Sequence, residues 1–226
     1  MASEVDIANL ALAHLGDTAT VSSLNPPEGS AQAEHCARFY PIVRNSLLER
    51  YQWGFATKRI LLAQLPLDAA NTEWQYSYAA PSDMLNVISI LASDASDDNN
   101  ASSSVSTAYD WANFRDSSRL GYAPQQFACE VNADGVNVIY TNQANAMLRY
   151  TALISDSSKF SPLFVDCLGW LLAAYMAGPL IKGDVGAAMG KECMSAFQRI
   201  YSLAIVSDSN QRKVNPVHVV GWINNR

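Results

Sequence analysis

The sequence has few charged residues and no recognisable catalytic motif. Asp, Glu, Lys and Arg make up only 16% of its 226 residues, below the quarter or so that is usual, so much of the surface is uncharged. Uncharged surface of this kind suits contacts between subunits. Hydrophobic residues make up 49%, and the length allows a sizeable core in one domain or one and a half.

Positive charge is scarce as well. The net charge is −6, whereas a protein that grips nucleic acid needs clustered Lys and Arg to neutralise phosphates. One basic run lies in and just after the second predicted helix. Salt bridges explain it better than a nucleic-acid site, because acidic residues lie nearby. Its members are Arg38, Arg44, Arg50, Lys58 and Arg59.

Cysteine and histidine are few and scattered. The four cysteines are far apart, which excludes a CxxC metal pair and favours reduced cysteines in a protein made in the cytosol. His35 and Cys36 are neighbours, but adjacent helical residues point about a hundred degrees apart and cannot form a catalytic pair. We expect neither a metal nor a cofactor.

Enzyme motifs are missing too. The sequence has no Gly-x-Ser-x-Gly, no His-Glu-x-x-His and no glycine-rich phosphate loop. Glutamates could form a glycosidase pair and aromatic residues could stack on sugars or bases. Chance explains the presence of several glutamates better than a glycosidase site does. Packing in the core or at an interface explains the aromatic residues better than a stacking platform does. These residues are Glu28, Glu34, Glu49 and Glu73, and Trp53, Trp74, Tyr76 and Tyr78. We therefore predict that the chain is not an enzyme.

Apolar residues at helical spacing predict two helices near the start of the chain. The first covers about residues 3–15, with Ser3 as its N-cap. The second covers about residues 30–51. Pro41 lies inside it, so we predict a kink or a break near Tyr40.

Two further helices are predicted near the end. One begins at Ser161-Pro162, and its uncharged residues 167–181 are too few to span a bilayer, so we expect a buried core helix. The other covers about residues 185–205. Residues 207–226 have no helical period but are rich in apolar side chains, so we expect an extended arm that docks on a partner.

The middle third predicts antiparallel strands, because apolar and polar residues alternate there. The hairpin signal Ala133-Asp134-Gly135 joins two of them. Residues 93–107 are nearly all Ser, Asp, Asn and Ala, which predicts a mobile loop; Asp94, Asp97 and Asp98 lack the spacing of a calcium site. The predicted strands are 59–65, 74–78, 85–91, 109–114, 126–131, 136–140 and 146–154.

The predicted fold class is α+β. The N- and C-terminal helix pairs cover each other's apolar faces in a helical bundle, with an inserted antiparallel β region and an extended C-terminal arm. The expected divisions are residues 1–57 and 160–206 for the bundle, 58–159 for the β region and 207–226 for the arm.

Many weakly specific residues, in order and spacing, resemble the podovirus tail tubular protein A family, the head-to-tail adaptors of short-tailed phages. The strongest block is residues 1–62, with Asn9–Leu12, Leu15-Gly16-Asp17, Ser23-Leu24, Ala31, Ala33, Cys36, Tyr40, Arg44, Leu48, Trp53, Phe55-Ala56 and Arg59. Later matches are Trp74–Tyr78, Pro81, Asp83, Phe164-Val165-Asp166, Leu168, Leu171, Ala173-Ala174, Phe197, Ala204 and Asp208.

The resemblance implies a virion structural protein. Twelve subunits would form a ring under the portal protein, with a channel through which DNA passes without specific binding. The β region would meet the tail nozzle, and the chain would be made in the host cytoplasm and contact no membrane. The arm would bind the portal through Val214, Val217, Val219, Val220, Trp222 and Ile223. We expect subunit contacts at Arg38, Arg44, Glu49 and Arg59.

Three alternatives stay open. The chain could be another head-completion or tail-terminator connector, a tail-associated cell-wall hydrolase, or a DNA-binding protein. The net charge of −6 speaks against the last.

Overall fold

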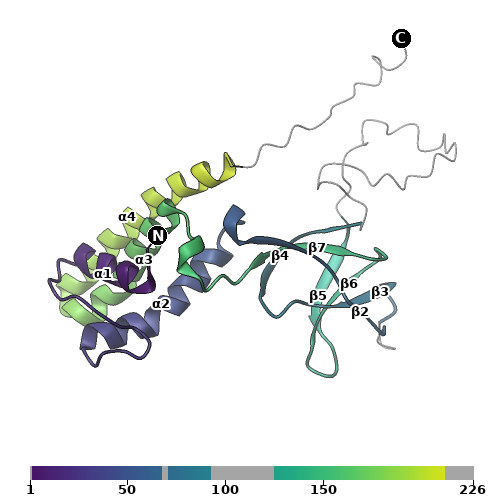
Figure 1. The fold of residues 1–226 in the computed structure, drawn as a ribbon, viewed down its shortest axis with the longest axis horizontal. Coiled ribbons are helices and arrows are strands. Elements are labelled where there is room, and N and C mark those ends of the chain that lie inside the picture. The colour runs from purple at the N-terminus through teal and green to yellow at the C-terminus, as the bar shows by residue number, and fades with distance from the viewer. Residues whose placement is uncertain (1, 68–70, 93–124, 212–226) are drawn as a thin grey trace, which may run out of the picture. The chain divides into compact units, whose positions relative to one another are not determined.

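The computed structural model describes residues 2–67, 71–92 and 125–211. In these residues the chain forms four α-helices and two antiparallel sheets, so the fold is mixed α and β, as predicted (Figure 1). The chain divides into two compact units. We call them the helical unit, with residues up to Ala56 and from Leu153 to the end of the last helix, and the β unit, with residues between Thr57 and Ala152.

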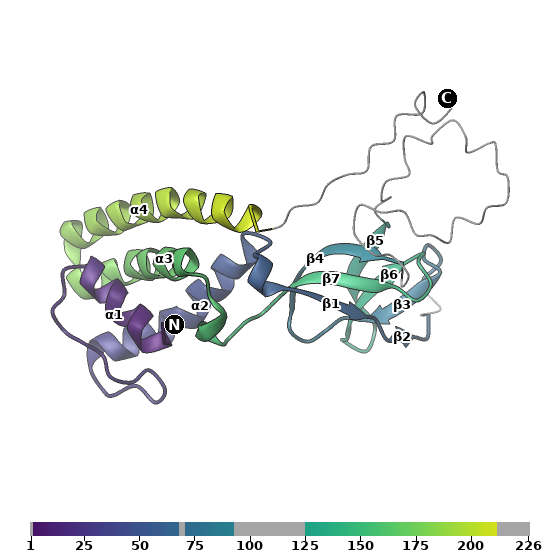
Figure 2. The same ribbon diagram turned by 45° about the horizontal axis from the view of Figure 1, so that its top comes forward.

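The helical unit is organised around one apolar helix. Helix α3 contacts each of the other three helices, and Figures 1 and 2 show it between α4 and the pair α1 and α2. Two short 3-10 turns, η1 and η3, precede the strands and α3 respectively. The bounds are α1 Glu4–His14, α2 Ala31–Glu49, η1 Gly54–Ala56, η3 Ser157–Lys159, α3 Pro162–Ile181 and α4 Gly183–Ser209.

The helix starts predicted at Ser3 and Ser161 are confirmed by their caps. The Ser3 hydroxyl accepts from the backbone N–H of Asp6, whose carboxylate in turn accepts from the Ser3 N–H at 2.8 Å. This reciprocal pair satisfies two amide donors that have no partner inside the helix. At the start of α3, the Ser161 hydroxyl accepts from the backbone N–H of Phe164, and Pro162 occupies the first helical position.

Helix α2 does not break at Pro41, contrary to one of the two outcomes predicted for that position. The helix is continuous from Ala31 to Glu49. Proline removes one hydrogen-bond donor, but residues before and after it share a buried face that holds both halves in one helix. That face contains Ala33, Cys36, Tyr40, Val43, Leu47 and Leu48.

Helix α3 is apolar on all sides, and nine of its residues are buried. By length and composition it could cross a membrane, and half of its most apolar window is buried inside the fold. A helix that is apolar all round is typical of a protein core. The buried core helix predicted from residues 167–181 is therefore observed.

Helices α3 and α4 meet closely at a one-residue turn. Lys182 and Gly183 both have positive φ angles, which reverse the chain between the helices. A Cβ atom on Gly186 would lie 2.9 Å from the Ala177 carbonyl oxygen, so this glycine is needed for the close approach of the two helices.

Helix α4 is longer than predicted at both ends, and a buried carboxylate holds its last turn. Asp208 is 7% exposed and accepts a hydrogen bond from the Gly54 N–H at 2.9 Å. The pKa of Asp208 is raised because burial disfavours its charged form, and the Gly54 hydrogen bond partly offsets this effect. Residues 207–209, predicted as the start of the arm, belong to this helix.

The β unit contains two antiparallel sheets in the described residues. The strand orders are β1-β7-β4 and β2-β3-β6-β5. Large buried side chains from both sheets, such as Ile90, Ile139 and Leu148, show that the sheets share a core. The strands are β1 Thr57–Leu61, β2 Gln64–Leu65, β3 Tyr76–Ala79, β4 Met84–Leu91, β5 Phe127–Val131, β6 Asn137–Thr141 and β7 Met147–Ala152.

Most predicted strands are confirmed, with one division. The apolar run 59–65 forms two strands, because the chain passes from one sheet to the other between Leu61 and Gln64. The Leu62 N–H donates to the Ala146 carbonyl, which fixes this passage. The strand predicted at 109–114 and the loop at 93–107 lie outside the described residues.

One carboxylate ties the start of β4 to two other strands. Asp83 accepts from Lys58 Nζ of β1 at 2.6 Å and from the Tyr150 hydroxyl of β7 at 2.9 Å. The Lys58 hydrogen bond is the main reason that the pKa of Asp83 is lowered. Burial, followed by the bond to Asp83, raises the pKa of Tyr150 to about 12.

Candidate interaction surfaces

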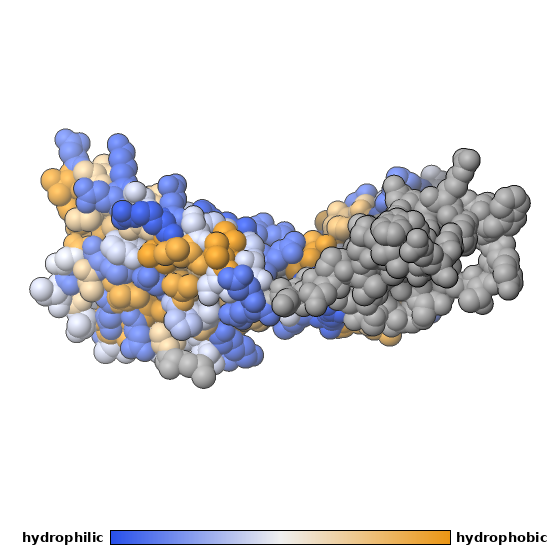
Figure 3. Space-filling view, turned by 90° about the horizontal axis from the view of Figure 1, so that it is seen from above, coloured by the Kyte–Doolittle hydropathy of each residue, from blue (hydrophilic) through white to orange (hydrophobic). Residues whose placement is uncertain are grey.

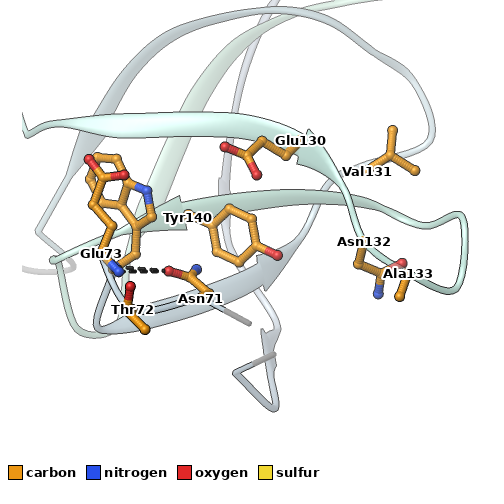
Figure 4. Close-up of a pocket in the computed structure, with 9 residues that line it drawn as sticks. Asn71, Thr72, Glu73, Glu130, Val131, Asn132, Ala133 and Tyr140 are labelled. Carbon is orange, nitrogen blue, oxygen red and sulfur yellow. Dashed lines mark hydrogen bonds between the residues drawn. The ribbon is translucent and has the colours of Figure 1, made fainter. Parts of the chain in front are cut away.

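A groove lies over one face of the sheet β2-β3-β6-β5. It consists of two adjoining cavities, of about 280 and 450 Å³, which share Asn132, Ala133 and Tyr140. We call the pair the acidic groove. Figure 4 shows the first cavity, with Tyr140 between the segment that contains Asn71 and the strand that carries Glu130.

One wall of the groove is a short segment before β3 that folds around an asparagine. The Asn71 side-chain oxygen accepts from the backbone N–H groups of Glu73 and Trp74, both at 3.1 Å. The Gln75 N–H donates to the Asn142 side chain, which attaches the segment to the end of β6. The Asn71 amide nitrogen is buried and lacks a hydrogen-bond partner.

The opposite wall is the turn between β5 and β6, where the predicted hairpin signal is confirmed. The Asn132 side-chain oxygen accepts from the N–H groups of Asp134 and Val136, at 3.0 and 2.9 Å. Gly135 has φ +78°, a conformation that glycine adopts without strain. The hydrogen bonds make this wall a preformed part of the groove.

The two cavities differ in chemistry. Glu73 and Glu130 line the first, together with Trp74 and polar side chains. The second is mostly apolar, with Asp134 at its border. None of the described lining residues is Lys, Arg or His, so the groove suits an occupant that carries both cationic and apolar groups. The apolar lining residues of the second cavity include Leu65, Pro66, Leu67 and Val136.

A second surface is the outer face of α4. Figure 3, which views the molecule from the α4 side, shows apolar patches on the helical unit among polar side chains. Val185, Leu203 and Val206 of α4 are 68%, 59% and 59% exposed. Exposed charged residues, including Glu192 and Arg199, lie at helical spacing between Val185 and Val206, so this side of α4 combines apolar and charged groups.

The four residues predicted for subunit contacts fall in both units. Arg38 is exposed on α2, whereas Arg44 is largely buried, 3.8 Å from Glu4 and above the Tyr40 ring. Glu49 is exposed at the end of α2. Arg59 belongs to the β unit, in register with Arg149 of β7. Arg38 and Glu49 are therefore the two of this set that α2 presents to solvent, while Arg44 acts within the chain.

The residues predicted to bind the portal, Val214 to Ile223, lie outside the described residues. So do the three aspartates of the segment 93–107. Among the described residues, no group of three His, Cys, Asp or Glu side chains could hold a metal ion.

The residues considered for catalysis are distributed over separate parts of the fold, and several make contacts that stabilise it. Cys36 is fully buried with its sulfur 3.3 Å from that of Met176, and burial raises the pKa of its thiol to about 11. Glu28 accepts hydrogen bonds from Ser22 and Ser30 in the loop before α2. Glu34 and Glu49 are on α2, and Glu73 lines the groove of the β unit.

Comparison of the chain with protein-family models and with curated protein sequences found no match.

Proposed function

We propose that the chain is a virion structural protein, a head-to-tail adaptor that joins the portal to the tail nozzle of a short-tailed phage. The order and spacing of residues across the chain support this proposal. The fold is compatible with it, because helices from both ends of the chain belong to one unit and the strands between them form another.

The observation that carries the proposal is the outer face of α4, which exposes the apolar residues Val185, Leu203 and Val206 alongside the charged residues Glu192 and Arg199. In a ring of twelve copies, helical bundles formed by α1 to α4 pack side by side, and this face meets the neighbour. An acidic chain around the channel repels the DNA backbone, so DNA passes without binding.

The remaining contacts involve the arm and the β unit. The C-terminal arm binds the portal through its apolar residues, and the β unit meets the nozzle. The protein is made in the host cytoplasm, resides in the neck of the virion and acts by assembly, without catalysis, cofactor or membrane contact.

Truncation of the arm tests the proposal. The structure sets the cut after Gln211, because removal of Asp208 would leave the Gly54 N–H without its acceptor. We expect a chain of residues 1–211 to keep the circular dichroism spectrum of the full chain but to lose binding to the portal ring in a sedimentation assay. Full portal binding by this folded, truncated chain would refute the role of the arm.

A matched pair of substitutions tests the α4 face. Leu203→Asp and Gln198→Asp both place a carboxylate on an exposed position of α4, and the second position lies on a different side of the helix. We expect the first to prevent ring formation, because it buries a charge at the subunit contact, and the second to have a smaller effect. Equal ring formation by the Leu203→Asp chain and the wild type would exclude this face as the interface.

A further inference from the structure

The acidic groove lacks an occupant of matching chemistry among the described residues. Glu73, Glu130 and Asp134 supply negative charge along it, and none of the lining residues that the structure describes is cationic. Apolar side chains form much of the second cavity. A peptide segment with cationic and apolar residues close together would satisfy both parts.

The buried amide of Asn71 also points to a peptide. Its oxygen already accepts two backbone hydrogen bonds, whereas its nitrogen has no acceptor. In Figure 4 this side chain lies beside Tyr140 on the cavity side. A backbone carbonyl of a segment bound in the first cavity would be a suitable acceptor for this nitrogen.

The sequence itself contains a segment of this chemistry. Residues 212–226 carry the cations Arg212, Lys213 and Arg226 and no Asp or Glu, in a chain whose net charge is −6. Their apolar residues are Val214, Val217, Val219, Val220, Trp222 and Ile223. We propose that residues 212–226 of one copy bind the acidic groove of a second copy.

Two arguments favour binding of the segment to the groove of a second copy. The groove and the segment are different surfaces, so their contact is heterologous, the type that repeats from copy to copy and closes into rings. Fifteen extended residues reach about 50 Å, and a four-stranded sheet is only about 15–20 Å wide, so the segment can span a neighbouring β unit. The proposal goes beyond the adaptor function, because it concerns copies that are not bound to a portal; portal binding by the same residues would replace this contact.

Zero-length cross-linking tests the contact directly. A carbodiimide joins an amine to a carboxylate only where the two touch. An equal mixture of unlabelled full-length protein and full-length protein labelled with heavy isotopes is cross-linked, and the cross-linked peptides are identified by mass spectrometry. The ion pair of Lys58 and Asp83, at 2.6 Å, is an internal positive control. Lys213→Arg is the matched negative control, because it keeps the charge and removes the amine.

The expected products join Lys213 of one copy to Glu73, Glu130 or Asp134 of another, as mixed heavy and light pairs. Same-copy products alone would overturn the choice of a second copy. Cross-links of Lys213 to other carboxylates only, or none while the Lys58–Asp83 product forms, would overturn the groove as the site.

Self-association provides an independent readout. In sedimentation velocity at low salt, we expect the double variant Glu73→Gln and Glu130→Gln to self-associate roughly 3- to 10-fold more weakly than wild type, since exposed ion pairs contribute modestly. Asp156→Asn removes an exposed carboxylate outside both the groove and α4, and should leave the association unchanged. Equal association of the groove variant and wild type would contradict the proposal. Portal binding is a separate assay, so failure of the adaptor function would be distinguishable.

Discussion

The contact between Asp208 and Gly54 predicts opposite outcomes for two similar substitutions. Asp208 is nearly buried in the last turn of α4 and accepts from the Gly54 N–H across the helical unit. Asp208→Asn keeps an oxygen acceptor and removes a buried charge. Asp208→Ala removes the acceptor and leaves the Gly54 donor without a partner.

The expected magnitudes follow from these contacts. A buried donor without a partner costs about 1–3 kcal/mol, so the free energy of unfolding should fall by that amount in Asp208→Ala. Asp208→Asn should equal the wild type or exceed it by up to about 1 kcal/mol at neutral pH, because it buries no charge. For a chain of this size, each 1 kcal/mol shifts Tm by about 2–4 °C.

The pH dependence gives the sign of the charge effect. The pKa of Asp208 is raised in the folded state, so the unfolded chain loses this proton at lower pH than the folded chain. Stability of the wild type relative to Asp208→Asn is therefore greatest below the unfolded pKa of about 3.9 and falls as pH rises through the folded pKa.

The measurement is the Tm of the wild type, Asp208→Asn and Asp208→Ala between pH 3 and 8. Circular dichroism at 222 nm follows the unfolding and reports mainly on the helical unit. A Tm for Asp208→Asn as low as that of Asp208→Ala at neutral pH would refute the reasoning. It would mean that the charge of Asp208, rather than its oxygen acceptor, stabilises α4.

Three further substitutions test the packing and the surface. Gly186→Ala should destabilise the helical unit by about 1–3 kcal/mol in chemical denaturation, because its Cβ would meet the Ala177 carbonyl, whereas Gly178→Ala, with open space around it, should not destabilise it. Tyr150→Phe should lower the stability of the β unit by roughly 1 kcal/mol, since Asp83 loses one donor; an unchanged denaturation midpoint would argue against that bond. Val206→Asp should leave Tm nearly unchanged, because the side chain is exposed, while it reduces ring formation measured by light scattering.

Local signals in the sequence predicted much of the fold. Ser3 and Ser161 mark helix starts through hydrogen bonds to residues three positions on, and alternation from Trp74 to Tyr78 marks a strand. Turn chemistry at Ala133 to Gly135 predicted the hairpin that forms one wall of the groove. Each of these signals depends on residues close together in the chain.

Contacts between distant residues escaped prediction. Asp208 and Gly54 are 154 positions apart, and nothing near Asp208 marks it as a buried acceptor, so α4 was expected to end earlier. The acidic groove needs Asn71 and Glu130 around the same cavity, which depends on the strand order. A kink or a break was predicted near Tyr40 because of Pro41; α2 does not break there, since tertiary packing of its buried face outweighs the local preference.

Negative-stain imaging of the protein mixed with the portal ring encoded in the same genome tests the adaptor role most directly. The proposal predicts a twelve-fold collar added to one end of the portal. Absence of any complex at micromolar concentration, with both proteins folded, would contradict it.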